Sequence, residues 1–242
     1  MLVIHHPYFI PWSGYFSKLV FADKLILLDD VLFSKRHDID RCTIVGMQSN
    51  PLYLNVPCGQ NMKIPIKDVI IEDDGFVEKI LMTIEHSYKC SKLFWETWEE
   101  IKNIISNSLV LGISLSDMNR NIIDGICNLL EIEIELINSS EYKCGTIDAT
   151  ERIIYFCNVV NDKKLLVGDG KGMGIHDIVK LRQNGIEIYQ QKYYTEHPIY
   201  FQCRRQKAEF LRAMSIVDAL LNIGIIETKK ILSAVKPKKL EV

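Results

Sequence analysis

The chain has 242 residues, of which 48% are hydrophobic and 25% are charged, as in an ordinary globular protein. This length is enough for one sizeable domain with its own core. The 29 lysine and arginine residues nearly balance the 31 aspartate and glutamate residues, so the formal net charge of -2 does not require a nucleic-acid partner.

The cysteines and the amino terminus bear on compartment and metal binding. The 7 cysteines contain no C-x-x-C pair, which argues against a zinc finger or a thioredoxin-like centre. The first residues lack the basic start of a signal peptide, and no apolar run is long enough to span a membrane. Scattered thiols in such a chain fit a reducing compartment. We therefore predict a cytoplasmic protein without a metal site or a membrane span.

The amino-terminal segment has the densest group of residues able to do chemistry. Residues 2–4 are apolar and predict a short buried strand, and His5 and His6 stand at its end. Pro11 and its neighbours delay the next helix until about Trp12. Open α/β sheets bind their ligands at the carboxyl ends of strands, which favours a site here. The alternative is that the two histidines are the edge of an ordinary loop.

A second polar group follows a second apolar run at residues 24–28. In a parallel βαβ unit the two strand ends lie side by side, so both groups are expected to meet in one crevice. A carboxylate beside a histidine can orient the imidazole for general base catalysis. An ordinary aspartate turn is the alternative. The residues of this second group are Asp29, Asp30, Ser34, Lys35 and Arg36.

Residues 5–36 resemble the opening of the WbqC-like family, which is found among enzymes that build bacterial surface polysaccharides. The family reads approximately His-Gln-Pro-Asn-Tyr-Leu-Pro-Trp-Leu-Gly-Tyr-Phe and then Leu-Asp-Asp-Val-Gln-Phe-Ser-Lys-Arg. This chain departs at His6 and Leu32, where the family has glutamine, and at Tyr8, where it has asparagine. It matches at His5, Pro7, Pro11, Trp12, Gly14, Tyr15, Phe16, Leu28, Asp29, Asp30, Val31, Phe33, Ser34, Lys35 and Arg36.

The middle of the chain reads as a hairpin followed by helices. Two β-compatible segments, residues 42–45 and 52–56, flank a turn-rich stretch and predict a β-hairpin. Apolar residues at helical spacing then predict helices at 76–86 and 93–105. Residues 48–108 are therefore a candidate insertion within a single α/β domain that covers residues 1–242. Tyr88 resembles a family tyrosine that follows a helix.

From residue 115 helical and strand patterns alternate. Repeated units of this kind predict a mostly parallel, Rossmann-like sheet flanked by helices. The strand at residues 2–4 should be central, between the strands at 24–28 and 165–167. The predicted helices cover residues 115–130, 146–160 and 175–183, and the predicted strands cover residues 132–137, 165–167 and 186–189.

A glycine-rich stretch separates the strand at 165–167 from its helix. Gly168, Gly170 and Gly172 are spaced neither as in a P-loop nor as in a dinucleotide-binding turn. Contact with an anion or a nucleotide diphosphate and a merely flexible turn remain equal alternatives. The WbqC-like family has a similar loop here, usually with serine where this chain has Val167.

The carboxyl-terminal third resembles the closing pattern of the family, with Tyr200 and Gln202 in its Tyr-x-Gln sequence. Ser215 and Asp218 lie in its Leu-Ser-Ile-Ile-Asp sequence, and these four residues are candidates for substrate binding. Ser215 is also expected to cap a helix that Gly224 stops.

The resemblance implies an enzyme that modifies an amino sugar, most plausibly by acyl or aminoacyl transfer to the amine of a nucleotide-linked sugar in O-antigen or capsule biosynthesis. A neutral histidine can accept the proton that the amine loses, and cations can hold a diphosphate. We assign catalytic roles to His5, His6, Asp29 and Asp30, with His5 as base or orienter. Anion binding is assigned to Lys35, Arg36, Arg41 or the glycine loop. The other candidate substrate-binding residues are Tyr8, Trp12, Tyr15, Ser34 and Tyr88.

Two other functions stay open at this point. A histidine after a first strand also occurs in nucleotidyl-transferring α/β enzymes, so an ATP-using enzyme of the same pathway is one alternative. A non-catalytic module that binds a sugar nucleotide is the other. Acyl-CoA and aminoacyl-tRNA are both possible donors, and the sequence identifies neither a cofactor nor an oligomeric state.

Overall fold

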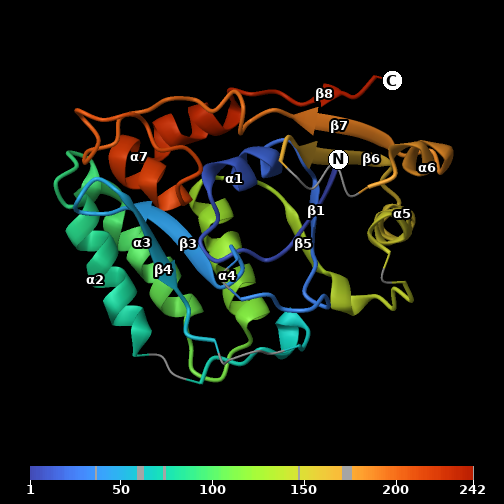
Figure 1. Ribbon diagram of the computed structural model, residues 1–242, viewed down its shortest axis with the longest axis horizontal. Coiled ribbons are helices and arrows are strands. Elements are labelled where there is room, and N and C mark those ends of the chain that lie inside the picture. The colour runs from blue at the N-terminus through green and yellow to red at the C-terminus, as the bar shows by residue number, and fades with distance from the viewer. Residues whose placement is uncertain (36, 59–62, 73–74, 147, 171–175, 242) are drawn as a thin grey trace.

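A six-stranded sheet is the centre of the computed structural model, which describes residues 1–35, 37–58, 63–72, 75–146, 148–170 and 176–241 (Figure 1). The strands of this sheet are β1 Leu2–His5, β2 Lys24–Leu27, β5 Glu135–Asn138, β6 Lys164–Gly168, β7 Glu187–Gln191 and β8 Lys238–Lys239. Their order is β5-β2-β1-β6-β7-β8, and every neighbouring pair is parallel except β7 with β8. The predicted α/β fold with a mostly parallel sheet is confirmed.

Helices flank this sheet, and a separate hairpin lies beside it (Figure 1). The helices are α1 Ser13–Leu19, α2 Phe76–Tyr88, α3 Phe94–Ser108, α4 Leu115–Leu129, α5 Ala149–Val159, α6 Ile178–Gln183 and α7 Ile216–Ser233, with short 3₁₀ turns η1 Ile66–Asp68 and η2 Ser139–Glu141. The hairpin pairs β3 Arg41–Val45 with β4 Pro51–Asn55 in antiparallel register, as predicted. The predicted division into a domain with an insertion stays a prediction.

Strand β1 is central because its residues are apolar on both faces. Leu2, Ile26 and Leu165 belong to a buried cluster with residues of α5 and α6, whereas Val3 and Leu25 belong to a second cluster with residues of α1, α4 and α7. Alternate side chains of a strand point to opposite faces, so the two clusters mark two covered faces of the sheet. Burial on both sides is typical of parallel sheets.

The strand order places the predicted polar segments at one edge. β1 pairs with β2 on one side and with β6 on the other, as the sequence predicts. Since these strands are parallel, their carboxyl ends meet at the same edge. His5 at the end of β1, the segment after β2, η2 after β5 and the glycine segment after β6 all leave the sheet at this edge.

Helix α7 departs from prediction at both of its marked positions. Ser215 occupies the N-cap position, but its side chain caps no helix N–H. The Ser215 hydroxyl instead donates to the carbonyl of Ile10 at 2.9 Å, and the Ser215 N–H donates to the carbonyl of Thr43 at 2.7 Å. Gly224, with φ of 74°, breaks the helix as expected, but a second helical stretch follows the kink up to Ser233. Glycine tolerates this conformation because it has no Cβ.

Candidate functional site

Four aromatic rings and one ammonium group surround the end of β1. We call His5, His6, Tyr8, Tyr15 and Lys18 the histidine cluster. The His5 ring lies edge-on to the rings of Tyr8 and Tyr15, with centroids 4.6 and 4.7 Å away. The His6 ring stacks on Tyr8 at 6.4 Å, and the Tyr15 hydroxyl donates to the His6 carbonyl at 3.2 Å. Both histidines are half-buried, so their rings are fixed by packing while solvent still reaches them.

The protonation state of His5 follows from its surroundings. Nδ1 lies 3.3 Å from the carbonyl oxygen of His6. A carbonyl only accepts hydrogen bonds, so this contact places the ring proton on Nδ1 and leaves a lone pair on Nε2. Burial, aided by the positive charge of Lys18, holds the pKa of His5 well below its ordinary value. His5 is therefore a neutral imidazole near pH 7, as a general base must be.

Lys18 is a functional candidate that sequence reasoning missed. Its side chain is only 9% exposed, and its Nζ forms no hydrogen bond or ion pair with any residue that the structure describes. Burial lowers the pKa of Lys18 to about 8, although the charge of Asp169 opposes this change. The nitrogen lies 5.7 Å from the centroid of the Tyr15 ring. Lysines are rarely so buried without a partner, which indicates a ligand or a chemical role.

The turn before α1 positions this cluster through one close contact. The Trp12 indole lies directly against Gly14, where an added Cβ would come within 2.1 Å of the ring. The other side of the indole stacks near His197, with ring centroids 6.3 Å apart. Only glycine permits this approach, which explains why a glycine stands in the first turn of α1, two residues after Trp12.

The aspartates after β2 are bound by groups from η2 and α5, more than 100 residues later in the sequence. One oxygen of Asp29 accepts hydrogen bonds from the Ser139 hydroxyl at 3.0 Å and the Ser140 N–H at 2.8 Å. The other oxygen accepts from the Ser140 hydroxyl at 2.6 Å. Asp29 is buried and both of its oxygens are occupied, so its contacts fix the segment after β2 to η2. Among the described residues Asp29 forms no hydrogen bond or ion pair with the His5 side chain.

Asp30 is more accessible than Asp29 and belongs to an ion pair. Its Oδ1 accepts from the Arg152 guanidinium at 2.6 Å and also from the Ser139 hydroxyl. Its Oδ2 has no hydrogen bond to a described residue. Arg152 also connects this carboxylate to the histidine cluster: burial lowers the pKa of His6, and the charges of His37 and Arg152 lower it further. Arg152, a residue that sequence reasoning did not select, thus pairs with Asp30 and also acts on His6 through its charge.

A third group of candidates forms a closed network below the surface. Asp218 is fully buried and accepts hydrogen bonds from the hydroxyls of Tyr88 at 2.8 Å and Tyr200 at 2.6 Å. It also accepts from the amides of Gln202 at 2.8 Å and Asn222 at 3.2 Å. Burial raises the pKa of Asp218, although these hydrogen bonds oppose that rise. We call these five residues the Asp218 network, and they join α2, α7 and the segment between β7 and α7.

The remaining candidates are spread around the carboxyl edge. Lys35 is exposed and donates to the carbonyl of Cys58 at 3.2 Å, and Ser34 is exposed beside it. Gly168 is the last residue of β6 and Gly170 follows it, and a Cβ at Gly170 would meet nothing within 4 Å. Arg36 and Gly172 lie outside the described residues. Arg41 begins β3, with its guanidinium 4.6 Å from the centroid of the Tyr53 ring.

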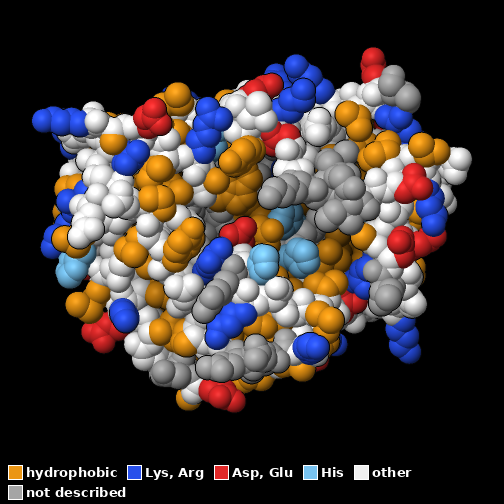
Figure 2. Space-filling view, viewed as in Figure 1, with side chains coloured by type: hydrophobic (Ala, Val, Ile, Leu, Met, Phe, Trp, Pro, Cys, Tyr) orange, Lys and Arg blue, Asp and Glu red, His pale blue; other side chains and the backbone are white. Residues whose placement is uncertain are grey.

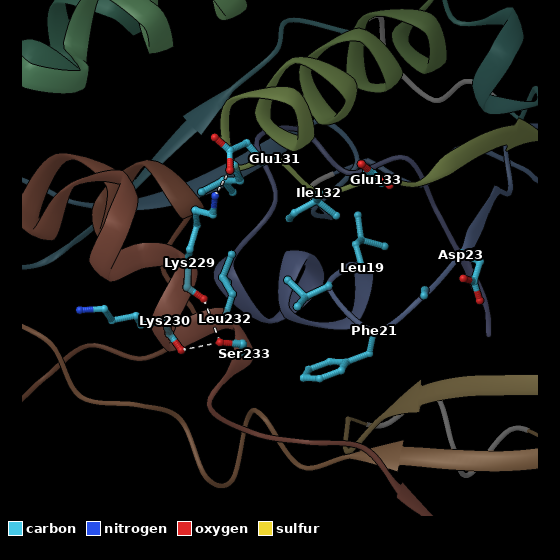
Figure 3. Close-up of a pocket in the computed structure, with 13 residues that line it drawn as sticks. Leu19, Phe21, Asp23, Glu131, Ile132, Glu133, Lys229, Lys230, Leu232 and Ser233 are labelled. Atoms are coloured by element: carbon cyan, nitrogen blue, oxygen red, sulfur yellow. Dashed lines mark hydrogen bonds and ion pairs between the residues drawn. The ribbon is translucent and has the colours of Figure 1, made fainter.

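Two cavities distinguish the two edges of the sheet. The larger, of about 690 Å³, is drawn in Figure 3, where Leu19, Phe21, Ile132 and Leu232 line it beside an ion pair between Lys229 and Glu131. Its walls come from residues just before β2 and β5, at the amino edge of the sheet, away from the histidines.

The second cavity lies at the carboxyl edge. It is a groove of about 450 Å³ whose lining includes Phe9 and Ile10, the residues that follow Tyr8 of the histidine cluster. Figure 2 shows histidine side chains gathered near the middle of this face, where the surface is hollowed, with basic side chains beside them. Since open sheets bind ligands at this edge, the smaller cavity is the relevant one.

Within the described ranges no group of three or more histidine, cysteine, aspartate or glutamate side chains could hold a metal ion. In the same ranges no helix is long and apolar enough to cross a membrane.

Comparison with known proteins identifies the family. The sequence matches the WbqC-like protein family over residues 6–230, which is most of its length. The chain belongs to this family. The match begins directly after His5 and includes the carboxylates after β2 and the Asp218 network. The resemblance inferred from the amino-terminal and carboxyl-terminal motifs is thereby confirmed.

One curated relative of similar length matches the chain. The uncharacterized protein Rv1507c of Mycobacterium tuberculosis (strain ATCC 25618 / H37Rv) is 24% identical over 218 residues, which cover 89% of this chain and 90% of that protein. No solved structure matches the chain. The name of the relative assigns no activity, so the function has to be argued from the site.

Proposed function

We propose that this WbqC-like protein transfers an acyl or aminoacyl group to the amine of a nucleotide-linked amino sugar in O-antigen or capsule biosynthesis. The observation that carries the proposal is the state of His5. It is a neutral, half-buried imidazole at the end of the central strand, with the lone pair of Nε2 available. An amine acceptor requires such a base, because it must lose a proton as it attacks.

The chemical step can be balanced with residues of the histidine cluster. The amine nitrogen bonds to the acyl carbon while its proton passes to His5 Nε2. The bond from the acyl carbon to the leaving sulfur or oxygen then breaks, and the proton passes from His5 to that atom. Acyl transfer develops negative charge on the carbonyl oxygen, and the unpaired ammonium of Lys18 is suited to stabilise it.

Asp30 and His6 are assigned to the acceptor sugar. Oδ2 of Asp30 has no hydrogen bond to a described residue and can accept from an amine or a sugar hydroxyl. Arg152 orients this carboxylate at 2.6 Å. His6, which is half-buried and whose pKa is lowered by burial and by the charges of His37 and Arg152, is a second hydrogen-bonding group for the sugar. Asp29 supports Asp30 through Ser139, whose hydroxyl lies within hydrogen-bond distance of both carboxylates and shares its single hydrogen between them.

The test is a direct assay of acyl transfer. Purified protein is mixed with amino sugars linked to UDP or dTDP and with either acyl-CoA or aminoacyl-tRNA. Mass spectrometry should find the nucleotide sugar heavier by the acyl group, with its diphosphate intact. The free thiol or deacylated tRNA should appear in equal amount, and the corresponding hydroxy sugars should stay unmodified.

Two other results would replace this proposal with the alternatives. Release of pyrophosphate from a nucleoside triphosphate, with no acylated product, would indicate nucleotidyl transfer. Tight binding of the sugar nucleotide without turnover by any donor would indicate a binding module.

A further inference from the structure

The groove at the carboxyl edge combines aromatic rings with two guanidinium groups. Its volume of about 450 Å³ lies within the range of small-molecule sites. The walls come from the turn after β1, the β3–β4 hairpin and the segments on either side of residue 200. The side chains that give it chemical character are Trp12, Asp38, Arg41, Tyr53, Tyr194 and Arg212.

Arg41 is incompletely satisfied in this groove. Its Nε is buried and has no hydrogen-bond partner, and its guanidinium forms no ion pair with a described carboxylate. A buried donor without a partner costs free energy, so such groups usually have a ligand. Asp38 also lines the groove and would repel an anion, but Arg41 and Arg212 outnumber it. The balance of charge favours an anionic ligand with oxygens that arginine can hold.

The aromatic side chains offer flat surfaces beside these charges. The side chains of Tyr53 and Tyr194 are 53% and 51% exposed, although both line the groove. The Trp12 indole contacts Gly14 and lies edge-to-face with the ring of Tyr194, whose centroid is 6.2 Å away. Rings that are fixed in orientation and open to solvent are typical stacking surfaces for nucleobases.

The groove adjoins the histidine cluster through one short segment. Phe9 and Ile10 line the groove, while the adjacent Tyr8 packs its ring 4.6 Å from His5. This segment therefore connects the histidine cluster to the wall of the groove, while no residue of the cluster itself is among the described lining residues. This arrangement suits a substrate with a large anionic part that binds and a small part that reacts.

We infer that this groove binds the nucleoside diphosphate of the substrate, with its base on the aromatic rings and its phosphates on Arg41 and Arg212. The inference rests on the proposed function, because the nucleotide is the unreactive part of that substrate. It differs from the prediction that the glycine loop holds the diphosphate. In this arrangement neither Gly168, at the end of β6, nor Gly170 holds the diphosphate.

The inference is tested by calorimetry with UDP and dTDP as probes and with the full chain. At least one of them should bind the native protein. Loss of a charge-assisted hydrogen bond should weaken its binding at least about tenfold in Arg41→Gln. Loss of a stacking ring should weaken binding about fivefold or more in Tyr53→Ala. Melting temperatures of both variants are measured alongside.

Two control variants distinguish binding in the groove from a general effect of charge and from binding at the glycine loop. Lys207→Gln removes an exposed charge outside the groove and should bind the probe like the native protein. Gly170→Ala places a methyl group in open space on the glycine loop and should also bind normally. Loss of binding in Gly170→Ala with normal binding in Arg41→Gln would overturn the inference. So would the absence of binding of both probes at millimolar concentration.

If acyl transfer is not the function, the results would differ from those that overturn nucleotide binding in the groove. In that case UDP or dTDP would still bind in a manner sensitive to Arg41 and Tyr53, while no donor would acylate an amino sugar. His5→Ala provides the converse control, because it should abolish transfer and leave binding of the free diphosphate unchanged.

Discussion

The histidine cluster and the Asp218 network both lie on family motifs, yet they differ in how their polar groups are satisfied. Every oxygen of the Asp218 carboxylate accepts two hydrogen bonds from side chains, and the carboxylate is fully buried. In the histidine cluster Lys18 has no described partner and His5 directs its Nε2 to no described donor. A closed network holds a fold together, whereas unpaired groups are available for a ligand.

The comparison divides the candidate residues of the WbqC-like motifs by role. Tyr88, Tyr200, Gln202 and Asp218 bind each other, so their sequence pattern is explained by packing of α2 against α7. Ser215 joins the same structural group because its hydroxyl donates to Ile10. The histidine cluster has no comparable internal explanation. Mutations in the two regions should therefore change different properties, activity in one and stability in the other.

The largest expected effect is on activity. His5→Ala removes the proposed base and should lower kcat for acyl transfer about 100- to 10,000-fold, the usual contribution of general base catalysis. Circular dichroism and the melting temperature should stay close to those of the native protein, because the ring is only half-buried.

The matched control is His86→Ala, which removes an exposed imidazole at the end of α2. Its activity should equal that of the native protein. Native activity in His5→Ala would show that His5 has no part in the mechanism. The histidine cluster would then have no catalytic role that distinguishes it from the Asp218 network.

The next largest effect is on stability. In Asp218→Asn either orientation of the new amide points its NH₂ group at another donor, either Gln202 or Asn222. Gln202 cannot turn to accept, because its Oε1 and Nε2 are both bound to the backbone of Leu211. The free energy of unfolding should fall by about 1.5–3 kcal/mol.

Urea denaturation measures this loss, and kcat of the folded variant should change little. Asp124→Asn, at an exposed position of α4, is the control and should change stability by less than about 0.5 kcal/mol. Native stability together with lost activity in Asp218→Asn would place this residue in the active site instead.

The sequence predicts the positions of strands better than the partners of side chains. The apolar run before His5 and the one before Asp29 are local patterns, so the strand order and the shared edge could be predicted. The contacts of Asp29 with Ser139 and Ser140 join residues 110 and 111 positions apart, and no local pattern indicates them.

Lys18 was missed for a related reason. Lysine is usually exposed, and the one indication of its burial is its position three residues after Tyr15 on the same face of α1. The sequence places Tyr88, Tyr200, Gln202 and Asp218 among the substrate-binding candidates, because a family motif marks importance without distinguishing packing from chemistry. The hydrogen bonds that fill both oxygens of Asp218 are what favours a packing role over a chemical one.

The third prediction concerns the contact between Trp12 and Gly14. Gly14→Ala would place a methyl carbon within 2.1 Å of the indole, so the ring must swing away from α1. We expect a loss of about 1–3 kcal/mol in stability, the usual cost of overpacking, and a changed near-ultraviolet circular dichroism spectrum.

Gly145→Ala is the control, since a Cβ there would meet nothing within 4 Å. The smaller ring in the double variant Gly14→Ala with Trp12→Phe should recover part of the stability. If Gly14→Ala and Gly145→Ala have the same stability and the same near-ultraviolet spectrum, then this contact does not fix the indole. Trp12 would then not be the ordered stacking surface that the proposed nucleotide site needs.

The smallest expected effect is a change in the pH dependence of His5. Its pKa is lowered mainly by burial and secondarily by the charge of Lys18. Lys18→Met removes that charge, so the pKa of His5 should rise modestly toward its ordinary value. The acidic limb of the kcat/KM profile should move to higher pH, because protonated His5 cannot act as a base.

NMR titration of the imidazole signals separates this effect from a general disturbance. The pKa of His6 is lowered by burial, His37 and Arg152, so it should stay unchanged in Lys18→Met and serves as an internal control. In Lys18→Arg the charge remains, and the acidic limb should stay in place. An alkaline limb near pH 8, where native Lys18 loses its proton, should move to higher pH in Lys18→Arg, since arginine stays protonated. Equal profiles for the native protein and both variants would show that Lys18 acts on neither His5 nor the reaction, and the contrast with the Asp218 network would then rest on His5 alone.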